Sequence, residues 1–450
     1  MIALLISGEI LLTTAPIRQP FIYGRPVRGV EFIGREAELR TIFNRLLNGE
    51  STAIVGEPHI GKTSLILHIA RPEIRLAAFG ADDKHYTLVS SDLHSVSNDY
   101  NPHQFWAEAL EPLTEMLAAT PRGPALLKQT AESQYSRRAL ENIFNYLGND
   151  LQHRLVLLLD EFDNLLVHNH FKDAAFFALL RSLSTRTGGL ALVTASRFSI
   201  AEMNERGRGL LDTGSPFFNN MIEVRLRPFN DKHVGTLLNR AAPPFTVDER
   251  RFVRRVAGGH PFLLQAMCAA LSEFAGEART SSAAESFYDR IAYHFDDLWE
   301  TMDDRTRTAA VILSLMEIGG RAQGRDFSFG EIENVPAFGP ELKKLAERGL
   351  AEKASEGWQF DLDHLLVWHG EKWTISAQAF TWWVRDVVVA ETREVTQYTD
   401  WLTNKKYRFL LTEQQWAQLK QVAGNLPEWA VQGVGGLARA LFEELLKRRP

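Results

Sequence analysis

GEPHIGKT, residues 56–63, carries the strongest indication of fold class in this chain. It follows a short apolar run at residues 52–55 and precedes residues 62–70, whose apolar spacing is helical. A strand, a glycine loop and a helix start in this order allow backbone N–H groups to wrap a polyphosphate, because glycine adopts dihedrals that other residues avoid. The first helical turn adds unpaired N–H groups and the positive end of the helix dipole. The stretch therefore predicts a phosphate-binding loop of the P-loop type.

The spacing GxxxxGK[ST] also assigns roles to single side chains of this loop. Lys62 is expected to reach the β- and γ-phosphates and to serve the reaction, and Thr63 to place its hydroxyl on a Mg²⁺ ion. The predicted nucleotide contacts are Gly56, Glu57, Pro58, His59, Ile60, Gly61, Lys62, Thr63 and Ser64. The alternatives are a plain glycine turn with an exposed lysine, or a degenerate loop that binds without turnover.

An acidic pair follows the most aliphatic run of the chain. In LVLLLDEFDN the run ends at Asp160 and Glu161. Mg²⁺ prefers oxygen ligands and keeps several waters, so Asp160 is predicted to hold the ion together with Thr63. Glu161 is predicted to orient and deprotonate the attacking water. The alternative is an ordinary solvated end of a strand.

A second polar tip follows the run GLALVTA at residues 189–195. Ser196 is predicted to lie between the water and the γ-phosphate, and Arg197 to stabilise charge on the transferred phosphoryl group. Both are therefore candidate catalytic residues. The alternative for Arg197 is a solvated arginine that merely follows a strand.

Strands alternate with helices through the first half of the chain. The predicted strands are residues 52–55, 85–91, 154–159, 189–195 and 222–226, with helices at residues 35–49, 62–70, 103–119, 134–148 and 172–186. This alternation predicts an α/β fold in which a parallel sheet lies between two helical layers, an αβα sandwich. Ligands of such sheets bind beyond the carboxyl ends of the strands, where the phosphate loop and the acidic pair are expected.

The rest of the chain divides by its pattern. We expect an N-terminal tail over residues 1–20, the nucleotide-binding domain over 21–228 and a helical lid over 229–285. The lid is interrupted by the bend Gly258-Gly259-His260-Pro261, which either abuts the nucleotide or is a plain interhelical turn. Residues 286–390 begin with helices and end in short β-like segments at 349–354, 357–361 and 372–376. Residues 391–450 form a small helical C-terminal segment.

Composition and charge bear on whether the chain binds nucleic acid, associates with a membrane or is secreted. The 450 residues carry a formal net charge of −6, so no global field draws the chain to nucleic acid or to an anionic membrane. Cys268 is the single cysteine, which excludes an intramolecular disulfide and favours a reducing, cytoplasmic location. The apolar N-terminus lacks a basic region and contains Glu9, so it fits a signal peptide poorly. The chain has no uninterrupted run of 18 apolar residues, so no membrane span is expected.

Several motifs in a fixed order carry a resemblance to a known family. The order is FIGREAEL at residues 32–39, the phosphate loop, LLLDEFD, LVTASR and GGHP. Together they resemble the STAND class of signal-transducing P-loop ATPases, a sister of the AAA+ ATPases, and in particular its bacterial and archaeal ATPase domains. SPFF at residues 215–218, followed by IEVRLRPF, resembles the archaeal type of that class. The resemblance covers residues 21–390.

The resemblance implies ATP or ADP as the bound nucleotide and further site residues. In that class the segment matching Ile33, Gly34 and Arg35 lies near the adenine, and the arginine matching Arg197 reports on the γ-phosphate. The proline matching Pro261 backs the nucleotide from the lid. A winged-helix domain packs on the nucleotide in the closed state, and residues 286–390 resemble it, with residues 342–354 as its main helix and first wing strand.

Two departures from the family pattern stand out. In the archaeal relatives an arginine follows the segment matching SPFF, whereas this chain has Asn219 and Asn220 there. Arg206 and Arg208 are the nearest substitutes, and surface solvation is the simpler role for both. No counterpart is evident for the lid arginine of AAA+ motors. A finger-like arginine in this region is therefore in doubt.

The charge of the C-terminal regions bears on partners. Residues 290–390 hold 11 Lys and Arg against 17 Asp and Glu, which disfavours DNA, although Lys343, Lys344 and Arg348 could form a local basic face. Residues 391–450 are either a protein-binding adaptor module or a helical cap. Tryptophans such as Trp382 and Trp383 are expected to be core anchors.

These observations favour one function over two others. We expect a slow ATPase that acts as a regulatory switch, binds a protein partner and changes its self-association with the nucleotide. The alternative is an AAA+-like machine that loads or remodels DNA or protein. A GTPase is disfavoured because NKKY at residues 404–407 lacks the aspartate of a guanine-reading NKxD motif.

Overall fold

The computed structural model describes residues 5–6, 9–10, 20–211, 218–303, 305–307, 309–310, 339–348, 350–353, 357–360, 366–369 and 373–391. The helical segment expected beyond residue 391 and the side chain of Arg208 lie outside this description. Strand β1 (Leu5–Ile6) pairs antiparallel with β2 (Glu9–Ile10) in the region expected to be a tail. Among the described residues, no helix is both long and apolar enough to span a bilayer.

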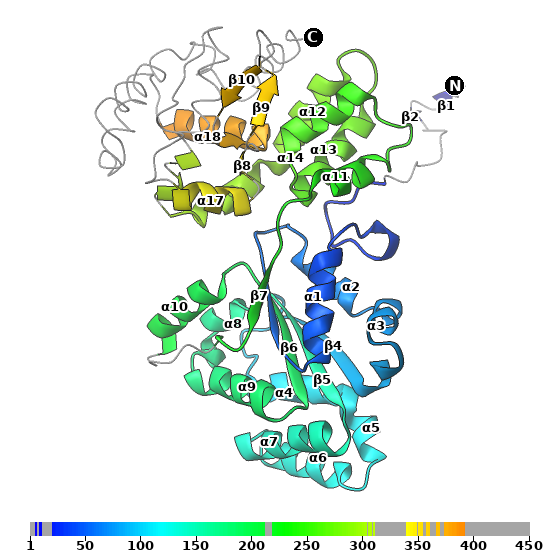
Figure 1. The fold of residues 1–450 in the computed structure, drawn as a ribbon, viewed down its shortest axis with the longest axis vertical. Coiled ribbons are helices and arrows are strands. Elements are labelled where there is room, and N and C mark those ends of the chain that lie inside the picture. Colours follow the sequence, from blue (N-terminus) through cyan, green and yellow to red (C-terminus); the bar gives the residue numbers. More distant parts are fainter. Residues whose placement is uncertain are drawn as a thin grey trace.

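A five-stranded parallel sheet forms the centre of the first domain (Figure 1). Its strands are β3 (Thr52–Val55), β4 (Tyr86–Asp92), β5 (Arg154–Asp160), β6 (Leu190–Ser196) and β7 (Ile222–Arg225). Each agrees with a predicted strand to within one residue at either end. Their spatial order is β4-β5-β6-β3-β7, so β6 lies between the strand of the phosphate loop and the strand of the acidic pair.

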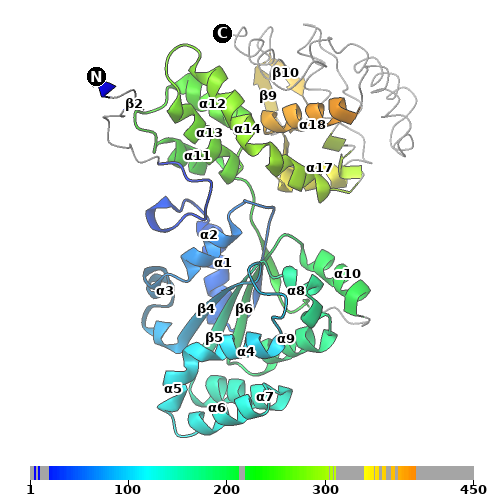
Figure 2. The same ribbon diagram turned by 180° about the vertical axis from the view of Figure 1, so that it is seen from behind.

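Strand β5 shows why the sheet is covered on both faces. Leu155, Leu157 and Leu159 pack into one apolar cluster, while Val156 and Leu158 pack into another. Successive side chains of a strand point to opposite faces, so a continuous aliphatic run requires two helical layers. The layers lie on either side of the sheet in Figures 1 and 2, which confirms the predicted αβα sandwich.

The helical layers contain more elements than the sequence pattern predicts. One face carries α1 (Glu36–Leu47), α2 (Lys62–Ile69) and α3 (Pro72–Phe79), which share a core cluster with the sheet. The other carries α4 (Pro102–Leu110), α5 (Thr114–Ala118), α6 (Gly123–Glu132), α7 (Arg137–Asn145), α8 (Asn164–Val167), α9 (Ala174–Arg186) and α10 (Ile200–Leu211). The single helix expected at residues 103–119 is broken, because Pro112 lies in a 3-10 turn (Glu111–Leu113).

Four helices follow the sheet and form the lid. They are α11 (Asp231–Leu238), α12 (Val247–Ala257), α13 (Pro261–Glu273) and α14 (Arg279–Glu300). Strand β7 leads directly into α11, so the lid lies at the carboxyl ends of the parallel strands (Figure 1). Helix α14 runs unbroken across residues 285 and 286, where the sequence pattern suggested a domain boundary. The lid and the elements after it therefore share one long helix.

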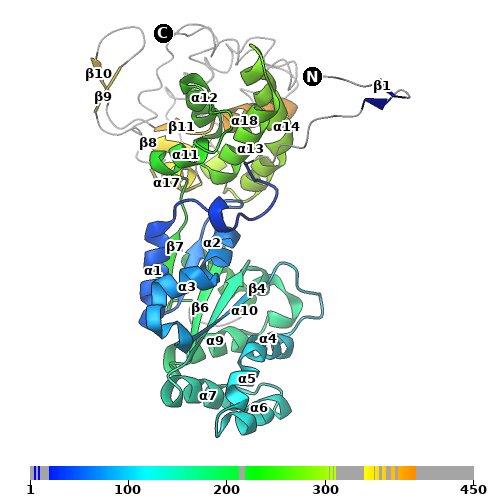
Figure 3. The ribbon, with the colours of Figure 1, turned by 90° about the vertical axis from the view of Figure 1, so that its right-hand side faces the viewer.

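A small α/β part adjoins the lid. Its elements are α17 (Gly339–Glu347), β8 (Ala351–Lys353), β9 (Gly357–Phe360), β10 (Leu366–His369), β11 (Trp373–Ile375) and α18 (Gln378–Glu391). Strand β8 pairs antiparallel with β11, and β9 with β10. Trp382 and Trp383 are buried in the lid core, as expected of anchors. In Figures 1 and 3 this part lies beside the lid, above the sheet.

Candidate functional site

The phosphate loop joins β3 to α2 and has the backbone that its glycines allow. Gly61 caps α2 with φ of 105°, and His59 also adopts a positive φ of 60°. The N–H of Gly56 donates to the carbonyl oxygen of Ser196, which holds the loop against β6 (3.2 Å). Lys62 is buried, and its Nζ donates to the carbonyl oxygens of Gly56 (3.0 Å) and Glu57 (3.2 Å). The lysine therefore lies inside the curve of the loop, as phosphate binding requires.

A cavity of about 460 Å³ opens beside this loop. Its walls come from the loop, the lid and the segment before α1. The predicted contacts that line it are Ile33, Arg35, Pro58, His59, Ile60, Gly61, Lys62, Thr63, Ser64, Glu161 and Pro261. Gly34, Gly56, Glu57, Asp160, Ser196 and Arg197 are not among its lining residues. Most of the predicted nucleotide-binding set is thus brought to one space.

The segment from Pro20 to Glu31 covers one side of the cavity. The N–H of Ile22 donates to Oε1 of Gln265 on α13 (2.8 Å), and the N–H of Val27 donates to Oγ of Ser64 on α2 (3.1 Å). Residues 22–27 line the cavity. This segment, which the sequence indicates only as a Gly- and Pro-rich loop, connects the lid to the phosphate loop.

Arg35 is a structural arginine rather than a free cation. It is buried, and its guanidinium donates to the carbonyl oxygens of Arg227 (2.7 Å) and Ile60 (3.1 Å). Burial lowers its pKa, and the nearby Glu38 opposes that shift. The adjoining Gly34 has φ of 70°, and a side chain there would meet His233. Arg35, in the segment predicted to lie near the adenine, therefore fixes the phosphate loop at Ile60 and the residues after β7 at Arg227.

The acidic pair lies at the tip of β5. Asp160 is buried, and burial raises its pKa while a hydrogen bond from Thr63 lowers it. Glu161 adopts φ of 50° and lines the cavity; burial raises its pKa too, with Lys62 opposing. The bond between Thr63 and Asp160 joins the two predicted metal ligands. Glu161 is left facing the space where a phosphate and a water would react.

The donor set at Thr63 and Asp160 fits Mg²⁺. A hydroxyl and a carboxylate, adjacent and supplied by two different elements, are oxygen ligands of the kind this ion takes together with waters and phosphates. A carboxylate that is 95% buried is costly unless it is hydrogen-bonded, paired or on a metal. An ion held there would neutralise phosphate charge.

The tip of β6 places its two candidate residues differently. The hydroxyl of Ser196 is buried, accepts from the N–H of Phe198 (2.9 Å) and faces the sulfur of Met203. Arg197 is partly exposed, and its Nε donates to Oδ2 of Asp163 (2.8 Å). Arg197 also acts on the pKa of Glu161 by its charge, so it lies near the acidic pair. The order of strands explains this, because β6 separates β3 from β5.

Asp163 is a residue that the sequence reading passed over. Its side chain is 1% exposed, and its Oδ1 has no hydrogen-bond partner among the described residues. The buried carboxylate of Asp163 accepts from one nitrogen of Arg197 and so holds the guanidinium in place. LLLDEFD does contain Asp163, but only the strand order reveals that it faces Arg197.

Lid and phosphate loop meet through a group of aromatic rings. His59 stacks on Phe262 (4.7 Å between centroids), and His294 lies 5.3 Å from His59 and 5.2 Å from His260. His260 and His294 are fully buried. Pro261, the first residue of α13, lines the cavity. The GGHP bend therefore borders the cavity through Pro261.

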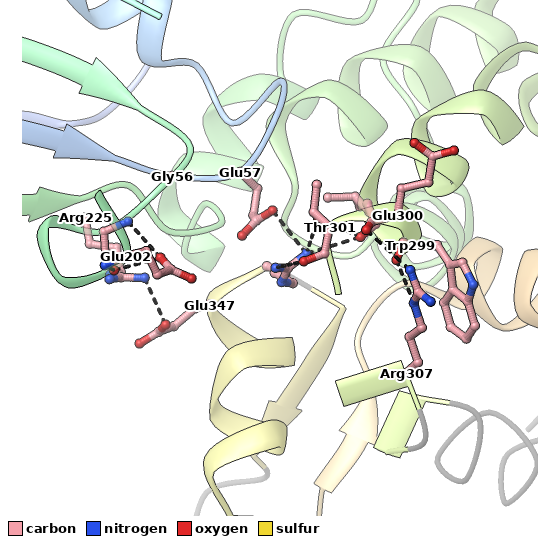
Figure 4. A network of polar contacts seen from close by, with 12 residues as sticks. Gly56, Glu57, Glu202, Arg225, Trp299, Glu300, Thr301, Arg307 and Glu347 are labelled. Carbon is pink, nitrogen blue, oxygen red and sulfur yellow. Dashed lines mark hydrogen bonds and ion pairs between the residues drawn. The ribbon is translucent and has the colours of Figure 1, made fainter. Parts of the chain in front are cut away.

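Glu57 turns away from the cavity and toward α17. Its Oε2 lies 3.4 Å from Nη1 of Arg348, and α17 also contacts β7 through Glu347 and Arg225 at 3.0 Å (Figure 4). No sequence pattern connects residues almost 300 positions apart. The loop's glutamate is thus a contact with the C-terminal part of the chain.

The residues near the missing arginine of the family pattern have local roles. The guanidinium of Arg206 lies 3.7 Å from the centre of the Phe198 ring. Asn219 accepts a hydrogen bond from Asn204 (2.8 Å), and Asn220 donates to Ser184 (3.2 Å). The two asparagines therefore attach the residues before β7 to helices α10 and α9.

The chain is similar to one family model and to several solved structures. The family model described as an AAA-like domain matches residues 32–310. A Walker-type ATPase of Pyrococcus abyssi is similar in structure at 15% identity, with a TM-score of 0.46, over 80% of this chain and 99% of that one. The ORC2 protein of Aeropyrum pernix, in ADPNP–ADP complexes, has 12% identity and a TM-score of 0.46 over 84% and 99%. Cdc6p of Pyrobaculum aerophilum has 13% identity and a TM-score of 0.33 over 84% and 97%.

The search of curated proteins found no match. The family model, in contrast, spans the phosphate loop, the acidic pair, the whole sheet and the lid. Since it covers more than half of the residues, the chain belongs to the family of AAA-like domains.

Proposed function

We propose that the chain binds ATP with Mg²⁺ and hydrolyses it slowly to ADP and phosphate. One observation carries this proposal: the phosphate loop and Glu161 line one cavity, and Thr63 of that loop is hydrogen-bonded to Asp160. Membership of the AAA-like family supports the same activity. The cavity's volume of about 460 Å³ is suited to a small-molecule ligand.

Each side chain of the site has a chemical role in this proposal. Lys62 and the N–H groups at the start of α2 bind the β- and γ-phosphates. Thr63 and Asp160 hold Mg²⁺, which supplies charge neutralisation at the phosphates. Glu161 orients a water and accepts its proton, and Arg197, held by Asp163, faces the transferred phosphoryl group. The hydroxyl of Ser196, which accepts the N–H of Phe198, supports the end of β6 that carries Arg197.

The base is proposed to lie between the lid and the segment before α1. Ile33, Tyr23, Phe262 and Tyr293 present apolar and aromatic surface to the cavity. Gln265 adds a polar group, whose Oε1 is already occupied by the N–H of Ile22. This setting suits a purine that is stacked and only sparsely hydrogen-bonded, in keeping with adenine.

We further propose that the ATPase is a regulatory switch of the STAND type. The lid contacts the phosphate loop through Phe262, and the region of residues 286–390, interpreted as a winged helix, contacts it through Arg348. A change of nucleotide would therefore bias how these parts pack, and a protein partner or a second copy of the chain would read the difference. A site for the partner is proposed on this part or on residues 391–450.

A second candidate is an AAA+-like ATPase that acts on DNA or on protein. The AAA-like family match supports it as well as it supports a switch. Two contacts weigh against DNA on α17: Lys344 pairs with Asp303 (2.6 Å) and Arg348 with Glu57. The basic face expected there is therefore occupied within the chain, apart from Lys343.

Mass photometry of the full chain separates these candidates. The protein is measured with Mg²⁺ and ADP, with a non-hydrolysable ATP analogue, and with the analogue plus duplex DNA. A switch predicts that its mass distribution differs between ADP and the analogue and ignores DNA. A DNA-bound species with the analogue would favour the second candidate, and identical distributions in all three would contradict nucleotide-controlled self-association.

A further inference from the structure

The phosphate loop carries a carboxylate where its ligand would be an anion. Glu57 pairs with Arg348, which follows α17, and the two side chains are only 16% and 14% exposed. Arg348 lies outside the family match, which ends at residue 310. The contact therefore connects the nucleotide site with a part of the chain to which the comparisons assign no role.

Arg348 is held in place before it meets Glu57. Its guanidinium donates to the carbonyl oxygen of Leu298 (3.2 Å) and to Oγ1 of Thr301 (2.8 Å) at the end of α14 (Figure 4). A long side chain that is already fixed loses little entropy when it forms an ion pair. One arginine thus joins the lid helix α14, the end of α17 and the phosphate loop.

A second ion pair fixes how α17 sits on the sheet. Glu347, the neighbour of Arg348, pairs with Arg225 on β7 (3.0 Å) (Figure 4). Glu347 and Arg348 are adjacent and oppositely charged, and each pairs with a residue of opposite charge on the first domain. Shifting α17 by one residue would bring like charges together, which is repulsive at this range.

The electrostatic balance at Glu57 depends on this contact. Burial raises its pKa, whereas the charges of Arg348 and Lys62 hold it down. Arg225 acts in the same direction as these two cations, and Glu202 on α10 acts against them. If Arg348 withdrew, a carboxylate next to Lys62 would lose its nearest cation. An uncompensated negative charge beside the loop repels a triphosphate.

We propose that Arg348 is a positioning residue of the nucleotide site. It neutralises Glu57 when α17 is docked, so that Mg–ATP binds tightly only to the docked state. By thermodynamic reciprocity, bound nucleotide then stabilises the docking of α17. This inference rests on the proposed ATP binding and names the contact that regulates it. The arginine acts through Glu57 and does not touch the nucleotide.

The test is a double-mutant cycle on the full chain. Calorimetry measures the affinity for a non-hydrolysable ATP analogue with Mg²⁺ in wild type, Arg348→Gln, Glu57→Gln and the double variant. Arg348→Gln is expected to weaken binding about tenfold. Glu57→Gln is expected not to weaken it, and Arg348→Gln should add no loss in that background. Lys344→Gln, on α17 four residues before Arg348 but paired with Asp303, is the matched control and should bind like wild type.

One further variant keeps the result decisive. Arg348→Lys retains the charge and should recover most of the affinity even if Arg348→Gln folds poorly. An equal loss for Arg348→Gln with and without Glu57→Gln would overturn the proposal, because the arginine would then act independently of Glu57. No loss in either background would overturn it too. Failure of the wild type to bind nucleotide would instead sink the proposed function.

Discussion

At the scale of single residues, Glu161 is the group whose environment most directly sets the chemistry. Burial raises its pKa above the ordinary value of 4.5, so its proton is lost only at higher pH than for an exposed glutamate. A base works in its deprotonated form. ATP turnover should therefore fall on acidification at a pH above the range in which ordinary glutamates protonate, as measured by steady-state rates at saturating ATP.

Glu161→Gln checks that this fall belongs to the base. The variant should bind the nucleotide as wild type does, turn it over about 100-fold more slowly, and show no such inflection in its residual rate. Circular dichroism at each pH separates titration of the site from acid unfolding. Wild-type turnover in this variant would show that another group accepts the proton.

Asp163 is expected to matter for turnover rather than for binding. Asp163→Asn keeps the size of the side chain but removes the charge that holds Nε of Arg197. We expect kcat to fall about tenfold, which corresponds to about 1.4 kcal/mol, with unchanged affinity for ATP. Asp173, an exposed residue that caps α9, offers a control: Asp173→Asn should leave kcat near wild type. An unchanged kcat in Asp163→Asn would remove the positioning role.

Single residues also show how far sequence reasoning reaches. Lys62, Thr63, Asp160 and Glu161 could be predicted because a local motif fixes each role on one strand or helix. Asp163 and Gln265 could not be identified in this way. Their importance comes from partners that the strand order and the lid bring close, and no local spacing encodes those contacts.

At the scale of elements, glycines at close contacts decide how helices pack on the sheet. Gly189 begins the run into β6, and a Cβ there would overlap the backbone oxygen of Phe144 at the end of α7. Gly189→Ala should therefore destabilise the protein by about 1–3 kcal/mol, through forced displacement of α7. Urea unfolding followed by fluorescence measures this change.

Gly235 in α11 is the matched control for that substitution. Nothing lies within 4 Å of a Cβ built at this position, so Gly235→Ala should stabilise by about 0.5–1 kcal/mol through helix propensity. Equal effects of the two substitutions would contradict the packing argument. The opposite signs are expected because a Cβ at residue 189 must displace the backbone of Phe144, whereas a Cβ at residue 235 meets open space.

Strands were easier to predict than helices, for a physical reason. A strand covered on both faces reads as a continuous aliphatic run, as at residues 155–159. The helices α3, α6 and α10 were not predicted from periodicity, although Pro72 and Pro124 stand in the first turns of α3 and α6. The pairing order of the strands was not predictable from composition either.

At the scale of the whole molecule, a histidine pair joins the lid to the phosphate loop. Burial lowers the pKa of His260 to about 3 and that of His294 well below its ordinary 6.5. The unfolded chain therefore binds protons between about pH 6.5 and 3 that the folded chain does not. By linkage, stability rises with pH in that window, by at most about 1.4 kcal/mol per pH unit for each histidine.

The melting temperature should accordingly fall as the pH is lowered from 7 to 5. His294→Phe, which keeps a ring beside Phe262 and Phe295, should make this fall shallower. His170→Gln, at an exposed histidine, is the control and should leave the profile unchanged. A profile that His294→Phe does not alter would show that the acid sensitivity arises elsewhere.

Long-range organisation is where sequence reasoning was weakest. The αβα sandwich and a lid after residue 228 could be predicted, since both follow from local periodicity along the chain. The contact of Glu57 with Arg348 could not, because it depends on how α14 and α17 are placed over the sheet. The interpretation of residues 286–390 as a winged helix, and the partner it would serve, remain predictions.

Calorimetric titration of Mg–ATP into the wild type and Lys62→Ala tests the central claim most directly. Lys62 is buried within the curve of the phosphate loop, where its charge would lie against a bound triphosphate. We expect one site per chain in the wild type and an affinity at least about 100-fold weaker in the variant. Equal affinities in the two proteins would contradict it.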